Sequence, residues 1–144
     1  MTVKTPFEFF EVTADVGFRA HGQNLEEAFE NAALAVFYTI TDTKKINKRL
    51  SKRITIESED EKALLYDWLT ELLYLHDSEY LVFYKFRVKI RREKSDKYVL
   101  EADASGEEFN PSIHEIRDEV KAVTFHLMEI QRLNGYTVQV ILDI

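Results

Sequence analysis

Alternating apolar and polar residues along the chain predict a series of β-strands. Successive side chains of a strand point to opposite faces, so a half-buried strand carries apolar residues at every second position. Strands are therefore expected at Phe7 to Glu11, Val16 to His21, Arg53 to Glu57, Tyr84 to Arg91 and Tyr98 to Ala104. The turn-like residues Lys94 to Lys97 predict that the last two of these form a hairpin.

Two further segments have the 3.6-residue period of amphipathic helices. Asn24 with Glu27 forms a capping-box pattern before the first helix, and Ser58 with Glu61 forms one before the second. We expect the second helix to end near Leu75 and each apolar stripe to face a sheet. The stripes are Leu25, Ala28, Phe29, Ala32, Val36, Phe37 and Ile40 in the first helix, and Leu64, Leu65, Trp68, Leu69, Leu72 and Leu73 in the second.

The C-terminal part of the chain predicts a hairpin whose residue pairing follows from its turn. Asn134-Gly135 lies between two runs rich in β-branched and aromatic residues, which favours a two-residue type I′ turn. If Leu133 faces Tyr136, His126 lies opposite Asp143 and Phe125 lies opposite Ile144. The preceding stretch, Gly106 to Ile116, lacks a period and is expected to be a loop, in which His114 is either solvent-exposed or a local hydrogen-bond partner.

Composition limits the class of protein. A chain of 144 residues is expected to form one domain, residues 1–144. No apolar run approaches the roughly 20 residues that span a bilayer, and the opening residues lack the apolar region of a signal peptide, so a cytoplasmic location is expected. The absence of cysteine excludes disulfides and thiolate metal sites.

The chain has no nucleotide-binding or hydrolase motif, so we do not expect an enzyme. Two other features carry candidate chemistry. Asp143 stands beside the terminal carboxylate of Ile144, and clustered carboxylates either repel each other or bind a hard divalent cation. Basic segments at 44–53 and 85–92 are typical of a solvent-facing strand or of an RNA-binding module, although the net charge of −7 argues against nucleic-acid binding by the protein as a whole.

Several motifs in order resemble those of the archease family: TADVGFRAHG, LEEAFENAALAVF, ALLYDWLTELLYLHD, HEIRDEVKAVTFH and the closing ILDI. The resemblance implies an α+β fold, with two amphipathic helices on a largely antiparallel or mixed sheet. It also implies a non-catalytic accessory protein of an RtcB-type RNA ligase in tRNA splicing. Such a protein promotes guanylylation and multiple turnover of the ligase, and is associated with tRNA indirectly, through the ligase.

The resemblance further implies a metal site formed by Asp15, Asp143 and the α-carboxylate of Ile144. Calcium is the expected cation, with magnesium or manganese as alternatives. His126, through its predicted pairing with Asp143, is a candidate for orienting that ligand. Many relatives carry a histidine where this chain has Val12, so that imidazole is missing here. The alternative function is an RNA- or tRNA-binding module that uses the basic segments 44–53 and 85–92.

Overall fold

The computed structural model describes residues 5–144; residues 1–4, which begin the stretch considered above for a signal peptide, lie outside it. The predicted α+β class is confirmed. The elements of residues 5–144 are β1 (Phe7–Val12), β2 (Asp15–Gly22), α1 (Leu25–Ile40), the short 3-10 helix η1 (Thr43–Lys45), β3 (Leu50–Ser58), α2 (Glu61–Glu79), β4 (Leu81–Arg92), β5 (Tyr98–Glu108), β6 (Ala122–Arg132) and β7 (Tyr136–Asp143).

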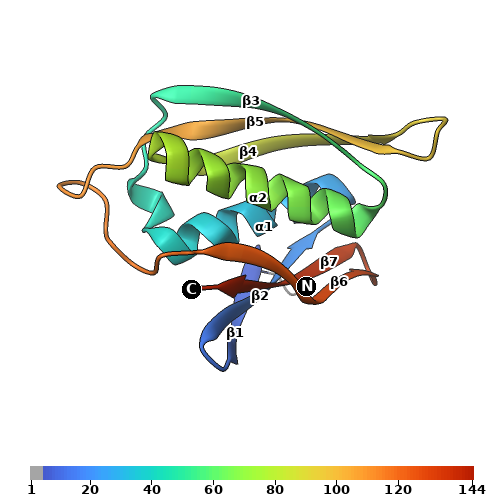
Figure 1. Cartoon of the computed structure of the whole chain (residues 1–144), viewed down its shortest axis with the longest axis horizontal. Helices are drawn as coiled ribbons and strands as arrows, with labels where there is room; N and C mark the ends of the chain where they lie inside the picture. Colours follow the sequence, from blue (N-terminus) through green and yellow to red (C-terminus); the bar gives the residue numbers. More distant parts are fainter. Residues whose placement is uncertain (1–4) are drawn as a thin grey trace.

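The strands divide between two antiparallel sheets rather than forming one. The four-stranded sheet has the order β1-β2-β7-β6, and the three-stranded sheet has the order β3-β5-β4. Both helices lie between the sheets (Figure 1), where α1 contacts β2 and β4, and α2 contacts β6 and β3. A helix between two sheets must be apolar on two sides, and α1 meets this need by burying Ala33 and Ala35 beside its main stripe.

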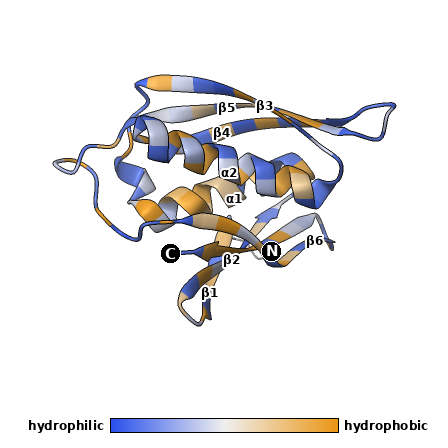
Figure 2. Cartoon of the chain, in the orientation of Figure 1, coloured by the Kyte–Doolittle hydropathy of each residue, from blue (hydrophilic) through white to orange (hydrophobic). Residues whose placement is uncertain are grey.

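The middle layer holds most of the core. All the stripe residues predicted for both helices are buried, including Phe29, Phe37 and Trp68. The indole N–H of Trp68 donates to the carbonyl of Phe29 over 3.1 Å, which joins α2 to α1. Figure 2 shows much of the hydrophobic colour on α1 and β2, whereas the tip of the β4–β5 hairpin is hydrophilic.

The start of α1 follows the prediction, and that of α2 does not. Asn24 accepts a 2.8 Å hydrogen bond from the Glu27 N–H, and Glu27 accepts one from the N–H of Gln23. The α2 cap is Asp60, which accepts from the Ala63 N–H, while the Ser58 hydroxyl donates to Asp67. The predicted capping box at Ser58 is therefore wrong. Asp60 directly precedes α2, so its side chain caps the helix in place of Ser58.

Most element boundaries extend beyond the predicted ones. α2 runs to Glu79 and ends at Tyr80, whose φ of 59° is left-handed. β5 runs to Glu108, so the first residues of the expected 106–116 loop belong to a strand. Within residues 5–144, neither helix is both long and apolar enough to cross a bilayer.

The register of the last hairpin differs from the prediction. Arg132 pairs with Tyr136, which leaves a three-residue connection, and the ladder then shifts between Thr124 and Glu129 until Ala122 faces Asp143. The shift coincides with Leu127 at φ 55°, whose carbonyl accepts a hydrogen bond from the Gln139 side chain. The predicted pairings of His126 with Asp143 and of Phe125 with Ile144 are therefore wrong, because the connection has three residues instead of two and the bulge adds residues mainly to β6.

Candidate functional site

Asp15 and Asp143 lie opposite each other on neighbouring strands. Thr13 and Ala14 form a tight turn after β1, so Val12 pairs with Asp15, and Ala14 has a left-handed φ of 64°. In the β2–β7 ladder Asp15 is the partner of Asp143. The expected meeting of these two residues is therefore present in the fold.

The end of the chain is held close to this pair. The Asp143 carbonyl accepts a 2.7 Å hydrogen bond from the Lys121 N–H, which ties the end of β7 to the segment before β6. Ile144 is half-buried and its side chain packs against the core. Its backbone is thereby kept beside Asp143, which is itself exposed, while Asp15 is half-buried.

The chemistry of these groups fits a hard cation. Directly opposed residues on antiparallel strands have Cβ atoms about 4.5–5.5 Å apart, and like charges there repel each other. A divalent cation between the carboxylates would remove that repulsion, and oxygen ligands suit calcium, magnesium or manganese. Within residues 5–144, no group of three or more His, Cys, Asp or Glu side chains is arranged to hold a metal ion. A cation bound by this pair would therefore need ligands other than a third such side chain.

Of positions 12 and 126, only position 12 lies next to the Asp15–Asp143 pair. Val12 is the cross-strand partner of Asp15, so a histidine there would stand beside the carboxylate. His126 lies in the β6 bulge and is exposed. The residue opposite Asp143 is Ala122, not His126 as predicted. The basis for His126 as an orienting partner of Asp143 is therefore absent.

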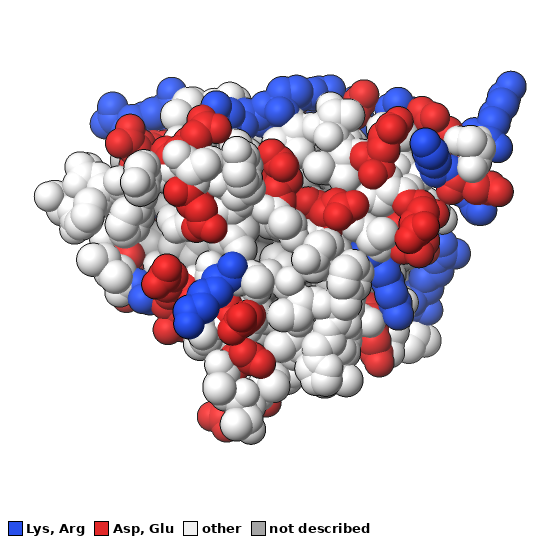
Figure 3. Space-filling model, in the orientation of Figure 1, with Lys and Arg blue, Asp and Glu red and all other residues white. Residues whose placement is uncertain are grey.

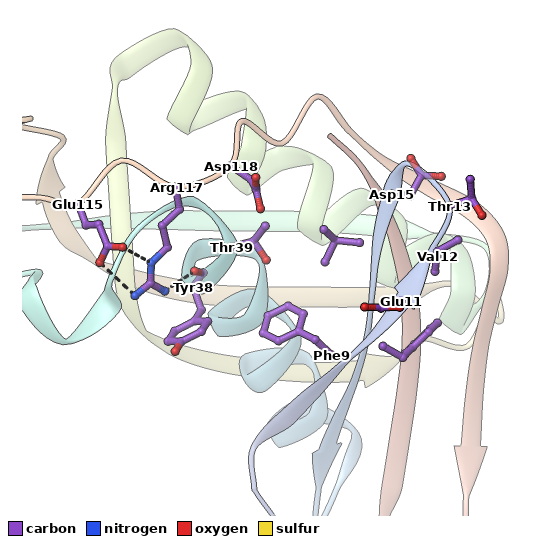
Figure 4. A pocket seen from close by; sticks show the side chains of 12 residues that line it. Phe9, Glu11, Val12, Thr13, Asp15, Tyr38, Thr39, Glu115, Arg117 and Asp118 are labelled. Atoms are coloured by element: carbon purple, nitrogen blue, oxygen red, sulfur yellow. Dashed lines mark hydrogen bonds and ion pairs between the residues drawn. The ribbon is translucent and has the colours of Figure 1, made fainter.

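Asp15 also lines a cleft of about 950 Å³ (Figure 4). One wall is β1 with its turn, the second is the last turn of α1, and the third is residues 115–118 of the loop between β5 and β6. That loop is held against α1 because the N–H groups of Arg117 and Asp118 donate to the carbonyls of Ile40 and Thr39. The remaining lining residues are Phe9, Phe10, Glu11, Val12, Thr13, Val16, Tyr38 and Glu115.

Two fixed interactions shape the cleft walls. The Arg117 guanidinium binds Glu115 at 3.2 Å, donates to the Tyr38 carbonyl at 2.9 Å and lies 4.4 Å from the centre of the Tyr38 ring. The hydrogen bond to Glu115, together with the carboxylate charge, raises the pKa of Arg117 and keeps it charged. On the opposite wall, the Phe10 ring covers Gly17, where a Cβ atom would collide with it.

A buried network secures the base of the 109–121 loop. Glu107 accepts hydrogen bonds from the Asn47 N–H at 2.6 Å, from Arg49 at 3.2 Å and from His114 Nε2 at 2.9 Å. His114 Nδ1 accepts from the Asn110 N–H, so Nε2 carries the proton. Burial acts to raise the pKa of Glu107, but these hydrogen bonds and the nearby positive charge outweigh it and lower the pKa. Of the two expectations for His114, the local hydrogen-bond partner is the one observed.

Basic side chains gather along the three-stranded sheet (Figure 3). The cations of β4 are exposed on alternate positions, as predicted: Lys85, Arg87, Lys89 and Arg91. The neighbouring strand β5 carries Glu101 and Asp103, and Glu101 pairs with both Arg53 and Arg91. Because β4 is an edge strand, its cations also discourage pairing with another chain. Mixed charges of this kind are typical of a solvated face.

Comparison with known proteins decides the family. The profile of the Archease protein family (MTH1598/TM1083) matches residues 7–144. This chain belongs to the archease family. Protein archease from Methanothermobacter thermautotrophicus is 55% identical over 139 residues, covering 96% of this chain and 98% of the relative. Protein archease from Pyrococcus furiosus is 52% identical over 127 residues, covering 88% and 89%.

A solved structure agrees with both the family and the fold. The solution structure of protein 1598 from Methanobacterium thermoautotrophicum matches with a TM-score of 0.86 at 54% identity, over 96% of this chain and 99% of that one. The archease resemblance drawn from the motifs is therefore confirmed. The sequence did not single out Glu11, Tyr38 or Asp118 as members of an archease cleft, because they come from three separate segments without a shared motif.

Proposed function

We propose that this archease is a non-catalytic, cytoplasmic accessory protein that activates an RtcB-type RNA ligase in tRNA splicing. It promotes guanylylation of the ligase and restores it for further turnovers, and it reaches tRNA through the ligase. Membership of the archease family supports the role. The observation that carries the proposal is the cross-strand pairing of Asp15 with Asp143, which gathers acidic oxygen ligands at an accessible edge of the fold.

In this proposal Asp15, Asp143 and the α-carboxylate of Ile144 hold one divalent cation. Calcium is preferred because it accepts carboxylates and water in flexible geometry, whereas magnesium requires nearly ideal octahedral geometry. When bound, the cation supplies positive charge that helps to organise the metal and nucleotide chemistry of the ligase. The residues of this chain position the cation and attach it to a rigid sheet.

The test is RNA ligation by the cognate ligase under single-turnover and multiple-turnover conditions, with and without this protein. We expect stimulation by the full chain, and loss of stimulation by a chain that lacks Asp143 and Ile144. Thermal unfolding of the shortened chain checks that it folds. Equal stimulation by both chains would contradict the metal site, and no stimulation by the full chain would contradict the function.

A further inference from the structure

We propose that the cleft beside Asp15 receives an extended basic segment of a protein partner. A lysine or arginine of that segment lies between Glu11 and Asp118, and a neighbouring apolar side chain rests on Phe9 and Tyr38. The inference rests on the proposed function, under which the partner is the RtcB-type ligase, and it assigns the surface by which the ligase is held.

The charge of the cleft selects the class of occupant. The Arg117 guanidinium is already bound by Glu115 and by the Tyr38 carbonyl, as the dashed lines in Figure 4 show. Within residues 5–144, the side chains of Glu11 and Asp118 form no ion pair. A phosphate-bearing ligand would meet uncompensated negative charge there, whereas a cationic side chain would be attracted.

The aromatic wall supplies the apolar part of the contact. Phe9 is 41% exposed and Tyr38 is 37% exposed, and their rings stack with centroids 6.0 Å apart. Phe7 and Phe18 support Phe9 from behind, and Arg117 covers the Tyr38 ring. These rings are already held in place, so a partner loses little freedom by binding to them. Aromatic residues in such positions commonly carry much of the binding energy of protein interfaces.

The cleft is large enough for a chain segment and has an apolar rim. A volume of about 950 Å³ exceeds the need of one side chain. In the loop between β5 and β6, Ile116 is 73% exposed and Ile113 is 52% exposed. Both are close in sequence to Glu115 and Arg117, which line the cleft. Exposed large apolar residues beside a cleft are typical of a protein-binding surface.

The geometry also relates this surface to the cation. Asp15 belongs both to the cleft lining and to the Asp15–Asp143 pair, so a partner in the cleft lies next to the proposed cation. A cation held by Asp15, Asp143 and the terminal carboxylate leaves Glu11 and Asp118 free for the partner. Docking and cation presentation are therefore compatible at one edge of the molecule.

The test is the affinity of this protein for the cognate ligase, measured by biolayer interferometry at low and moderate salt. The cleft variant is Glu11→Lys with Asp118→Lys. The control is Glu57→Lys with Glu129→Lys, which makes the same charge change at two exposed positions outside the cleft. We expect at least a tenfold loss of affinity for the cleft variant, and for the control a change below twofold. Equal affinities of the two variants would overturn the cleft assignment while leaving the ligase role intact.

Photocrosslinking gives a second measurement that does not depend on charge reversal. A benzoylphenylalanine placed at Tyr38 should crosslink to a ligase peptide that contains lysine or arginine. The same group at Tyr74, which is 61% exposed on α2, should not. Crosslinking from Tyr74 alone, or from Tyr38 to RNA instead of ligase, would overturn the inference. Absence of any binding between the unmodified protein and the ligase would instead overturn the proposed function.

Discussion

Asp15 and Asp143, which lie at opposite ends of the sequence, are direct partners in the β2–β7 ladder. Strand β2 begins at Asp15, directly after a tight turn, and strand β7 ends at Asp143. The fold thus places two like charges opposite each other, which is destabilising without a counterion. The arrangement is explained if a cation occupies the space between them.

Calcium should therefore raise the thermal stability of the protein. At a concentration about 100 times the dissociation constant, binding adds about 2.7 kcal/mol, or a rise in Tm of about 5–10 °C for a chain of this size. Differential scanning fluorimetry with calcium and with EGTA measures this shift. Asp15→Asn should abolish the shift while making the calcium-free protein slightly more stable than the unmodified one. A full calcium shift in that variant would exclude Asp15 as a ligand.

Replacing Val12 by histidine should change the choice of metal. Position 12 faces Asp15, so the imidazole would stand beside the carboxylate, and imidazole nitrogen favours zinc over calcium. We expect about a tenfold gain in zinc affinity relative to calcium by isothermal titration. Val12→Gln, which has no imidazole, is the control. An equal gain in both variants would show that position 12 does not contact the metal.

The Glu107 network should make stability depend on pH in acid. The lowered pKa of Glu107 means that folding favours its ionised form, so ionised Glu107 contributes to the free energy of unfolding. This stabilisation is fully present above the pKa of Glu107 in the unfolded chain, and it is lost as the pH falls through the pKa in the folded protein. Glu107→Gln should cost about 1–3 kcal/mol at pH 7, because the bonds to Asn47, Arg49 and His114 are weakened.

Urea unfolding at pH 7 and in the acid range measures this difference. The gap between the unmodified protein and Glu107→Gln should narrow as the pH falls. Glu57→Gln, at an exposed position, should change stability by less than about 0.5 kcal/mol. A gap that stays constant over the acid range would show that the charge of Glu107 does not contribute to stability.

Free RNA should bind weakly to this protein. Arg87 and Lys89 of β4 face Asp103 and Glu101 of β5, and Glu101 also pairs with Arg53 and Arg91. The cations therefore offer no continuous track for phosphates. Lys85→Glu with Lys89→Glu should leave stimulation of the ligase within twofold of the unmodified protein. Fluorescence anisotropy with a tRNA half provides the direct readout. Tight binding that weakens steeply between 50 and 200 mM salt would instead favour the RNA-binding alternative.

Short-range signals in the sequence predicted the local structure well. Asn24 and Glu27 determine the start of α1 through bonds within one turn, and the leucines of α2 repeat at the period that buries them. The pairing of Asp15 with Asp143 was expected only through the resemblance to archease, because the two residues are far apart in the chain. Family similarity thus supplied the long-range contact that local patterns do not contain.

Other features depended on tertiary context. The β6–β7 pairing was predicted incorrectly for two reasons: the connection has three residues instead of two, and the β6 bulge places Leu127 at a positive φ that leucine rarely adopts. The second sheet was hidden because Ala33 and Ala35 are small and give α1 only a weak second apolar face. The cleft joins Glu11, Tyr38 and Asp118 from separate elements, and no local pattern brings them together.

Multiple-turnover RNA ligation with Asp15→Asn measures whether the Asp15–Asp143 pair is needed to activate the ligase. Asp96→Asn is the matched control, because Asp96 lies in the exposed turn between β4 and β5 and asparagine tolerates its φ of 64°. We predict that Asp15→Asn reduces stimulation of the cognate ligase about 10- to 100-fold and that Asp96→Asn stimulates as the unmodified protein does. Undiminished stimulation by a folded Asp15→Asn protein would contradict a role for this pair in activating the ligase.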